Sequence, residues 1–280
     1  TWSVDRWSVW GTAASKYIAQ QTPSTKETGS STRIAAGFTN YLSVVSSSSY
    51  SVSSSDYFAL QYPIEGFTVS DLAWGTASAK TVTLSFQVYS SLTGTFGGSL
   101  QNSASNRCYP FSYTVSSANT WTQVSITIAG DTAGTWLTTN GRGIGVNFGL
   151  GVGSTYSGAA GAWASALYMS ATGAQSVVGT NGATFYITGV QLEVGTVATN
   201  FDYRPYSTEL AMCQRYYEKS FPYATAPAQN VGSALGAAYA TGQVLNQAFS
   251  TLVTFAATKR AAPTVTTYAP DAATANWSTN

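Results

Sequence analysis

The chain has 280 residues, of which 12 are Lys or Arg, 11 are Asp or Glu and none is histidine. The absence of histidine excludes a Ser-His-Asp triad, a histidine-bearing zinc site and an imidazole pH switch, and a net charge of +1 gives no electrostatic footprint for nucleic acid. Charged residues make up only 8% of the chain, whereas 37 serines and 39 threonines supply small hydroxyls, so hydroxyl groups rather than ion pairs solvate the surface.

Alternation of apolar and polar residues is the main structural signal. The alternating runs are residues 58–64, 82–88, 109–115 and 124–128. A period of two places one row of side chains against a core and the other toward water. Pro110 indicates an edge strand or a strand end, because proline cannot donate a ladder hydrogen bond. The turn-forming clusters between the runs are 46–49, 93–99, 130–134 and 139–141. This pattern predicts an all-β, antiparallel sandwich or barrel.

Two glycine-containing strands are irregular. In 143–152 the even positions are mainly apolar and the odd positions are almost all glycine. Because glycine exposes the backbone to close approach, we expect a neighbouring chain, a ligand or a loop of the same domain on that face. Apolar residues then occupy odd positions up to Ile187 and even positions from Val190, and this change of phase at Gly189 predicts a β-bulge.

Isolated aromatic residues define the candidate ligand site. Residues 153–182 are mostly small and carry Tyr156, Trp163 and Tyr168, while Trp136 follows a turn. Aromatic faces stack on the apolar C–H faces of sugar rings, so these four residues are the candidate ligand-binding residues. The alternative is that Trp136 and Trp163 pack over the edges of the sandwich. Trp121 adjoins an alternating strand and is expected in the core.

A short helix is expected after the sandwich. Ser207 or Thr208 can cap it, and Glu209 favours its positive end. Leu210, Cys213, Tyr216 and Tyr217 form its apolar stripe.

The predicted domains meet at Pro205, since a proline disfavours helix in the residue before it. They are residues 1–205, the sandwich, and 206–280, the helix followed by a second β region. The β-like part of this second region covers 249–266.

The remaining chemistry is limited. Cys108 and Cys213 are too few for a thiolate metal cage, and two free thiols are a commoner outcome than one bridge. No apolar run is long enough to span a bilayer. We therefore expect no metal, no cofactor and no membrane insertion. Glycoside hydrolysis by two carboxylates is the one enzymatic alternative, and its candidate acids are Asp5, Asp56, Glu65, Asp71, Asp131, Glu193 and Asp202.

Several segments carry a family resemblance. They are Asp-Arg-Trp at 5–7, Gln-Tyr-Pro-Ile-Glu-Gly at 61–66, 121–136, Ile-Thr-Gly-Val-Gln-Leu-Glu-Val-Gly at 187–195, 198–202, Cys-Gln-Arg-Tyr-Tyr-Glu at 213–218 and 259–265. Together they resemble a recurring module of bacteriophage virion proteins, such as tail fibres. The resemblance runs over nearly the whole chain and is most specific in its central portion.

The resemblance implies a virion appendage protein, exposed on the particle surface, with a jelly-roll sandwich similar to carbohydrate-binding modules. It implies contacts with other virion proteins, binding to a host-surface glycan and a homotrimer, and it supplies no catalytic residue. The candidate trimer contacts are 207–219 and the glycine face of 143–151. Relatives carry a strand before 5–7, and the C-terminal β segment stops before closing a sheet, so an incomplete second β region and a fragment of a longer fibre are expected.

The predicted function is a non-enzymatic structural and adhesive component of a phage particle, a tail fibre that binds host glycans. A fibre shaft or head-decoration module without receptor binding is the first alternative. A polysaccharide depolymerase is the second.

Overall fold

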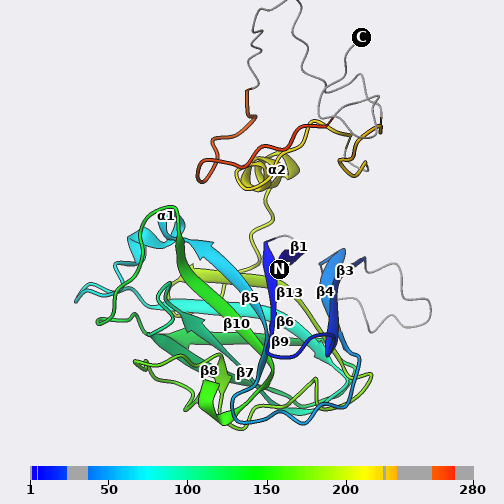
Figure 1. Cartoon of the computed structure of the whole chain (residues 1–280). Coiled ribbons are helices and arrows are strands. Elements are labelled where there is room, and N and C mark those ends of the chain that lie inside the picture. Colours follow the sequence, from blue (N-terminus) through cyan, green and yellow to red (C-terminus); the bar gives the residue numbers. More distant parts are fainter. Residues whose placement is uncertain (1, 5, 24–36, 223–224, 232–253, 269–280) are drawn as a thin grey trace, which may run out of the picture. The chain divides into compact units, whose positions relative to one another are not determined.

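Two antiparallel β-sheets packed against each other form the larger part of the chain (Figure 1). The structure is a computed structural model that describes residues 2–4, 6–23, 37–222, 225–231 and 254–268. It divides into two compact units, residues 1–202 and 203–280, so the observed division falls just before the predicted boundary at 205. The predicted all-β, antiparallel jelly-roll sandwich is confirmed.

The first sheet has six strands. In spatial order they are β1 (Trp2–Val4), β2 (Trp7–Gly11), β5 (Tyr57–Glu65), β10 (Arg142–Val152), β7 (Gly94–Gln101) and β8 (Cys108–Val115). Pro110 lies in β8, which ends this sheet, so the predicted edge strand is confirmed.

The second sheet has five strands. In spatial order they are β3 (Tyr17–Pro23), β4 (Asn40–Ser46), β13 (Thr184–Val194), β6 (Val82–Ser90) and β9 (Thr122–Ile128). In β13 the pairing with β6 shifts register between Thr188 and Gln191, and Gly189 has a φ of 59°. The predicted β-bulge is confirmed there.

The inner faces of both sheets supply one apolar core. The largest fully buried side chains include Phe58, Phe86, Phe96, Phe111, Phe148 and Phe185. Phe148 of β10 and Phe86 of β6 meet edge to face at 5.1 Å between ring centroids, which joins the two layers. Burying a large apolar side chain contributes roughly 1.5–3 kcal/mol, so the alternating strands account for the stability of the sandwich.

One predicted turn is a strand. Residues 93–99 were expected as a turn cluster, but Gly94–Gln101 forms β7. Its inner positions include Phe96 and Leu100, and the glycines between them fit confined places. A Cβ on Gly98 would lie 2.2 Å from the carbonyl oxygen of Asn147. Here glycine serves close packing rather than chain reversal.

Short elements connect the strands. They are α1 (Gly66–Val69), the 3-10 turns Ser70–Leu72 and Ser154–Tyr156, and the parallel pair β11 (Ser157–Gly158) and β12 (Ser170–Ala171). Within the described residues, no helix is long and apolar enough to cross a membrane.

The second unit contains helix α2 (Tyr206–Gln214). Pro205 stands at its N-cap without a side-chain cap, so the predicted capping by Ser207 or Thr208 is wrong, while Glu209 lies in the first turn as expected. Of the predicted β region, 249–253 lies outside the described residues, and the described 254–268 contain no strand. No disulfide joins Cys108 or Cys213 to another cysteine among the described residues.

Candidate functional site

Trp136 and Trp163, two of the predicted ligand residues, pack together with Trp74 at one end of the core. The three indole rings meet edge to face with centroids 4.8–5.4 Å apart. The Trp136 indole N–H donates to Asp131 at 2.9 Å, and that of Trp163 donates to the carbonyl oxygen of Ala129 at 2.8 Å. Their polar atoms are satisfied within the protein, as the packing alternative expects.

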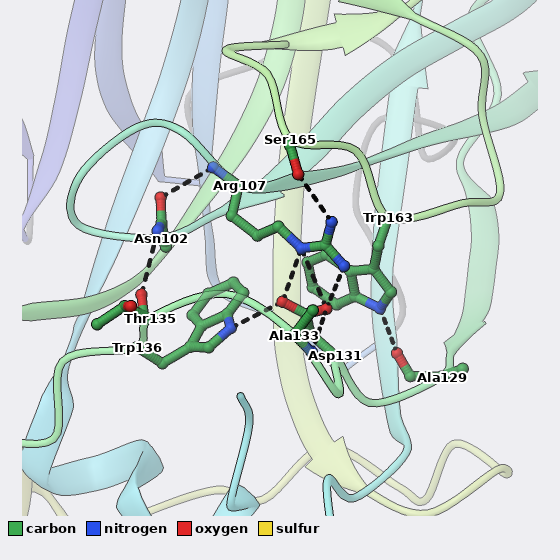
Figure 2. A network of polar contacts seen from close by, with 9 residues as sticks. All are labelled: Asn102, Arg107, Ala129, Asp131, Ala133, Thr135, Trp136, Trp163 and Ser165. Atoms are coloured by element: carbon green, nitrogen blue, oxygen red, sulfur yellow. Dashed lines mark hydrogen bonds and ion pairs between the residues drawn. The ribbon is translucent and has the colours of Figure 1, made fainter. Parts of the chain in front are cut away.

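Asp131 is the centre of this region (Figure 2). Its carboxylate accepts two-pronged donation from the Arg107 guanidinium, with Nε 2.9 Å from Oδ2, and a further bond from the backbone N–H of Ala133. The Asp131 side chain is fully buried. Burial raises the pKa of Asp131, but the bonds from Arg107, Trp136 and Ala133 outweigh it and hold the pKa below its ordinary value. The ion pair therefore has a structural role: it holds Arg107, Ala133 and Trp136 together.

Trp121 lies outside the main core. It packs with Tyr41, Tyr89 and Tyr186 in a separate aromatic cluster on the second sheet. The expected core position is thus corrected, because the residue precedes β9 and does not share the inward row of that strand.

The glycine face of β10 is covered by a loop of the same domain. Gly149 of β10 and Gly97 of β7 both face Ser170 of β12, and a Cβ on either would lie within 2.6 Å of the Ser170 hydroxyl. We call residues 153–172 the covering loop. Of the three occupants expected from the sequence, the loop is the one observed on this part of the face.

Tyr156 and Tyr168, the other predicted ligand residues, belong to the covering loop. The Tyr168 ring lies directly over Gly158, where a Cβ would come within 2.2 Å of it. Tyr156 meets Tyr57 of β5 edge to face at 5.1 Å. Only Tyr156 of the four predicted residues lines the pocket described next.

A row of polar side chains crosses the outer face of the first sheet. Gln61, Asn147 and Ser99 are register partners on β5, β10 and β7. The Gln61 amide donates to Asn147 Oδ1 at 2.7 Å, and the Asn147 amide donates to Ser99 Oγ at 3.0 Å. All three residues are buried, so the covering loop and its surroundings exclude water from a hydrogen-bonded floor.

Beside this row lies a pocket with a volume of about 150 Å³. Its lining residues are Trp10, Tyr57, Gln61, Gln101, Ser105, Arg142, Tyr156, Leu167 and Met169. Aromatic residues and hydrogen-bonding groups thus share a small cavity between the strands and the covering loop. Trp10 is 42% exposed and Leu167 is 37% exposed, so both remain accessible to a ligand.

Arg142 and Gln101 are two pocket residues that have unused nitrogen donors. Arg142 reaches the outer face because β10 shifts register between Arg142 and Ile144. Its guanidinium donates to the Gln61 side-chain oxygen and to the carbonyl oxygens of Asn102 and Ser103, each at 3.0 Å. The buried Nε2 of Gln101 has no hydrogen-bond acceptor in the part of the chain that the structure describes.

The candidate glycosidase acids do not gather at this pocket, since none of its lining residues is Asp or Glu. Asp56 accepts bonds from Thr12, Tyr50 and the backbone N–H of Ser53. Asp71 forms a loose surface pair with Lys80 at 3.9 Å. Asp5 lies outside the described residues. Among the described residues, no group of three or more His, Cys, Asp or Glu side chains could hold a metal ion.

Sequence reasoning missed most of the pocket. Of its strand residues, only Gln61 belongs to one of the alternating runs, in the row expected to face water. The others lie outside those runs and are Trp10, Tyr57, Gln101 and Arg142. The side-chain chemistry could have indicated the site. Gln61 and Asn147 are amides within otherwise small or apolar rows, and buried amides form side-chain hydrogen bonds. The register that brings them together is visible only in the folded sheet.

No family model and no curated protein matches this chain. Among solved structures, one similar fold is the enzymatically active domain of tailspike protein 4 of bacteriophage CBA120, at 9% identity and a TM-score of 0.39; the match covers 69% of this chain and 20% of that one. A CBM4 structure matches at 13% identity and a TM-score of 0.36, over 69% of this chain and 89% of that one. A family 11 carbohydrate-binding module from Clostridium thermocellum, in complex with a mixed-linked tetrasaccharide, matches at 11% identity and a TM-score of 0.35, over 70% and 93%.

Proposed function

We propose that this chain is a non-enzymatic glycan-binding module of a phage virion appendage, such as a tail fibre. The observation that supports it is the pocket on the first sheet, where Trp10, Tyr57 and Tyr156 offer aromatic surface beside amide and guanidinium donors. Sugars need both features, because their C–H faces stack on aromatic rings and their hydroxyls require polar partners. The placement on a phage particle rests on the sequence resemblance.

The experiment is binding of the purified chain to an array of bacterial surface glycans, compared with the Trp10→Ala variant. Removing this half-exposed ring should weaken glycan binding about 2- to 13-fold, since stacking on an aromatic ring contributes about 0.5–1.5 kcal/mol. Phe67→Ala is the matched control, because Phe67 is 59% exposed and does not line the pocket. Adsorption assays then test whether the chain blocks attachment of a phage to its host.

Two outcomes contradict the proposal. Absence of binding to any glycan would favour the shaft or decoration alternative, and shortened polysaccharide after incubation would favour the depolymerase. Equal loss in Trp10→Ala and Phe67→Ala would place binding outside the pocket.

The proposal includes a homotrimer, which would multiply weak single-site binding. Helix α2 and the residues after it supply apolar surface for self-association: Tyr206, Leu210, Tyr216 and Tyr217 are 39–74% exposed. Size-exclusion chromatography with light scattering should give three times the chain mass of 29.3 kDa. The Leu210→Asp variant should shift the mass toward the single chain, and a monomeric native protein would remove this part of the proposal.

A further inference from the structure

Arg142 is the one charged residue among those that line the pocket. Every acceptor that it meets is neutral: the side chain of Gln61, the carbonyl oxygens of Asn102 and Ser103, and the Ser105 hydroxyl at 3.1 Å. These four bonds leave other N–H groups of the guanidinium without an acceptor among the described residues. The positive charge is therefore held in place but not neutralised.

The surroundings of Arg142 differ from those of Arg107. Both arginines are partly buried, yet Arg107 faces the Asp131 carboxylate, whereas Arg142 faces no carboxylate among the described residues. The pKa values follow: the bond to Asp131 raises that of Arg107, and burial lowers that of Arg142. Glu65 is the register partner of Arg142 on β5, but no ion pair joins them. The neutral acceptors around this partly buried cation do not neutralise its charge, so an anionic ligand group would complete its set of partners.

Gln101 adds a second donor to the lining of the pocket. Its residue is only 1% exposed, and its amide nitrogen has no acceptor within the described structure. The Arg142 guanidinium bonds to the carbonyl oxygen of Asn102, the next residue along the chain, so both donors border the same small space. Together they present positive charge and N–H groups that a ligand oxygen would satisfy.

Aromatic surface also lines the cavity, since Trp10, Tyr57 and Tyr156 are among its lining residues. The cavity of about 150 Å³ is smaller than the roughly 300–1,000 Å³ of pockets for drug-sized ligands. It therefore fits one small ring rather than a long chain segment. A ring with an apolar face and one anionic substituent matches this combination of lining residues.

We infer that the pocket, if it binds glycans as proposed above, selects an acidic saccharide and places its anionic group against Arg142 and Gln101. A carboxylate is the group that fits best, because the planar guanidinium donates to carboxylates in two-pronged geometry. Sulfate and phosphate esters share this charge and are distinguished in the experiment below.

The experiment measures binding by titration calorimetry in EDTA, with pairs of probes of which one member carries an anionic group and the other is neutral. The pairs are trigalacturonic acid and its methyl ester, sialyllactose and lactose, and sulfated lactose and lactose. We expect the carboxylated member of a pair to bind about 10–100-fold more tightly than its neutral partner, as for hydrogen bonds to charged groups, and the preference to shrink as salt rises.

Two variants at Leu167 test the role of charge in the pocket and leave the Gln61–Asn147–Ser99 row unchanged. Leu167 lines the pocket from the covering loop and is 37% exposed, so Leu167→Glu adds a negative charge and Leu167→Gln adds the same shape without it. Leu167→Glu should abolish the preference for the acid, and Leu167→Gln should keep it. Arg142→Gln should also abolish it, with circular dichroism as the check that the 102–105 turn survives.

The outcomes separate the two proposals. Equal affinity for acidic and neutral probes, with loss of both in Trp10→Ala, would overturn the inference and leave the proposed function standing. Acid binding that persists in Leu167→Glu and Arg142→Gln would place the anion elsewhere and overturn the inference. A preference for sulfated over carboxylated probes would correct the assigned group. Binding of no saccharide, charged or neutral, would overturn both.

Discussion

At the scale of single residues, Asp131 has the largest structural effect. Its carboxylate connects Arg107, Trp136 and the backbone of Ala133, and through them a cluster of three tryptophans. Although the chain has few charged residues, this buried Arg107–Asp131 ion pair stabilises the fold. Removing one partner would leave the other charge buried and unpaired, which is the costly case.

We expect Asp131→Asn to lower the free energy of unfolding by about 3–5 kcal/mol. Chemical denaturation followed by tryptophan fluorescence measures this change, since the variant alters the surroundings of Trp136 directly. Asp71→Asn is the matched control: its partner Lys80 lies 3.9 Å away at an exposed site, and such pairs contribute about 0–1 kcal/mol. Equal effects of the two substitutions would contradict the structural role of Asp131.

At the scale of elements, the covering loop and the glycines beneath it act together, because the loop can pack on the sheet only where side chains are absent. Gly97 and Gly149 let Ser170 approach the sheet, and the loop then forms one wall of the pocket. The loop is fixed by backbone bonds from Met169 to Tyr156 at 2.7 Å and from Thr172 to Gly158 at 2.9 Å. The pocket thus depends on the absence of side chains at Gly97 and Gly149, on the neighbouring strands β7 and β10.

Gly149→Ala should displace the covering loop, because the new Cβ would lie 2.8 Å from the Cβ of Ser170. Overpacking of this kind costs about 1–3 kcal/mol, and hydrogen exchange should show faster exchange of the amides of Met169 and Thr172. Gly145→Ala is the matched control on the same face of β10, since its Cβ would meet only side-chain atoms, Gln61 Nε2 at 3.2 Å and Arg142 Cδ at 3.5 Å. Unchanged exchange in Gly149→Ala would mean that the loop adapts without opening.

The sequence was informative at this scale where packing follows a simple period. The edge strand at Pro110 and the bulge at Gly189 were predictable, because each breaks a local rule in a way that has one structural cause. The strand at 94–101 was missed, since Gly97 and Gly98 look like turn residues until their neighbours are known. Arg142 was missed as well, because a register shift turns it outward.

At the scale of the whole molecule, the absence of histidine determines the response to pH. No side chain with an ordinary pKa near neutrality is present to titrate. The backbone N–H of Ser53, the Thr12 hydroxyl and further bonds lower the pKa of Asp56 to about 2, whereas burial raises the pKa of Tyr17 and Tyr113.

We therefore expect the free energy of unfolding to stay constant from about pH 5 to 9. A carboxylate with a lowered folded-state pKa stabilises the fold above its unfolded pKa of about 4, and this contribution disappears as the pH falls toward 2. Tyrosines with raised pKa values stabilise the fold below about pH 10, and that contribution is lost above it. Thermal melts across pH 2–11 measure the curve, and a transition near pH 6–7 would contradict it.

The pocket is lined partly by strands of the first sheet and partly by the covering loop, and these two parts differ in how well they tolerate substitution. The strands that carry Gln61, Gln101 and Arg142 also bury the core on their other face, so substitutions there put folding at risk. The wall with Tyr156, Leu167 and Met169 comes from one contiguous stretch. Replacement of that stretch by another sequence would therefore change the lining of the pocket and leave the two sheets unaltered.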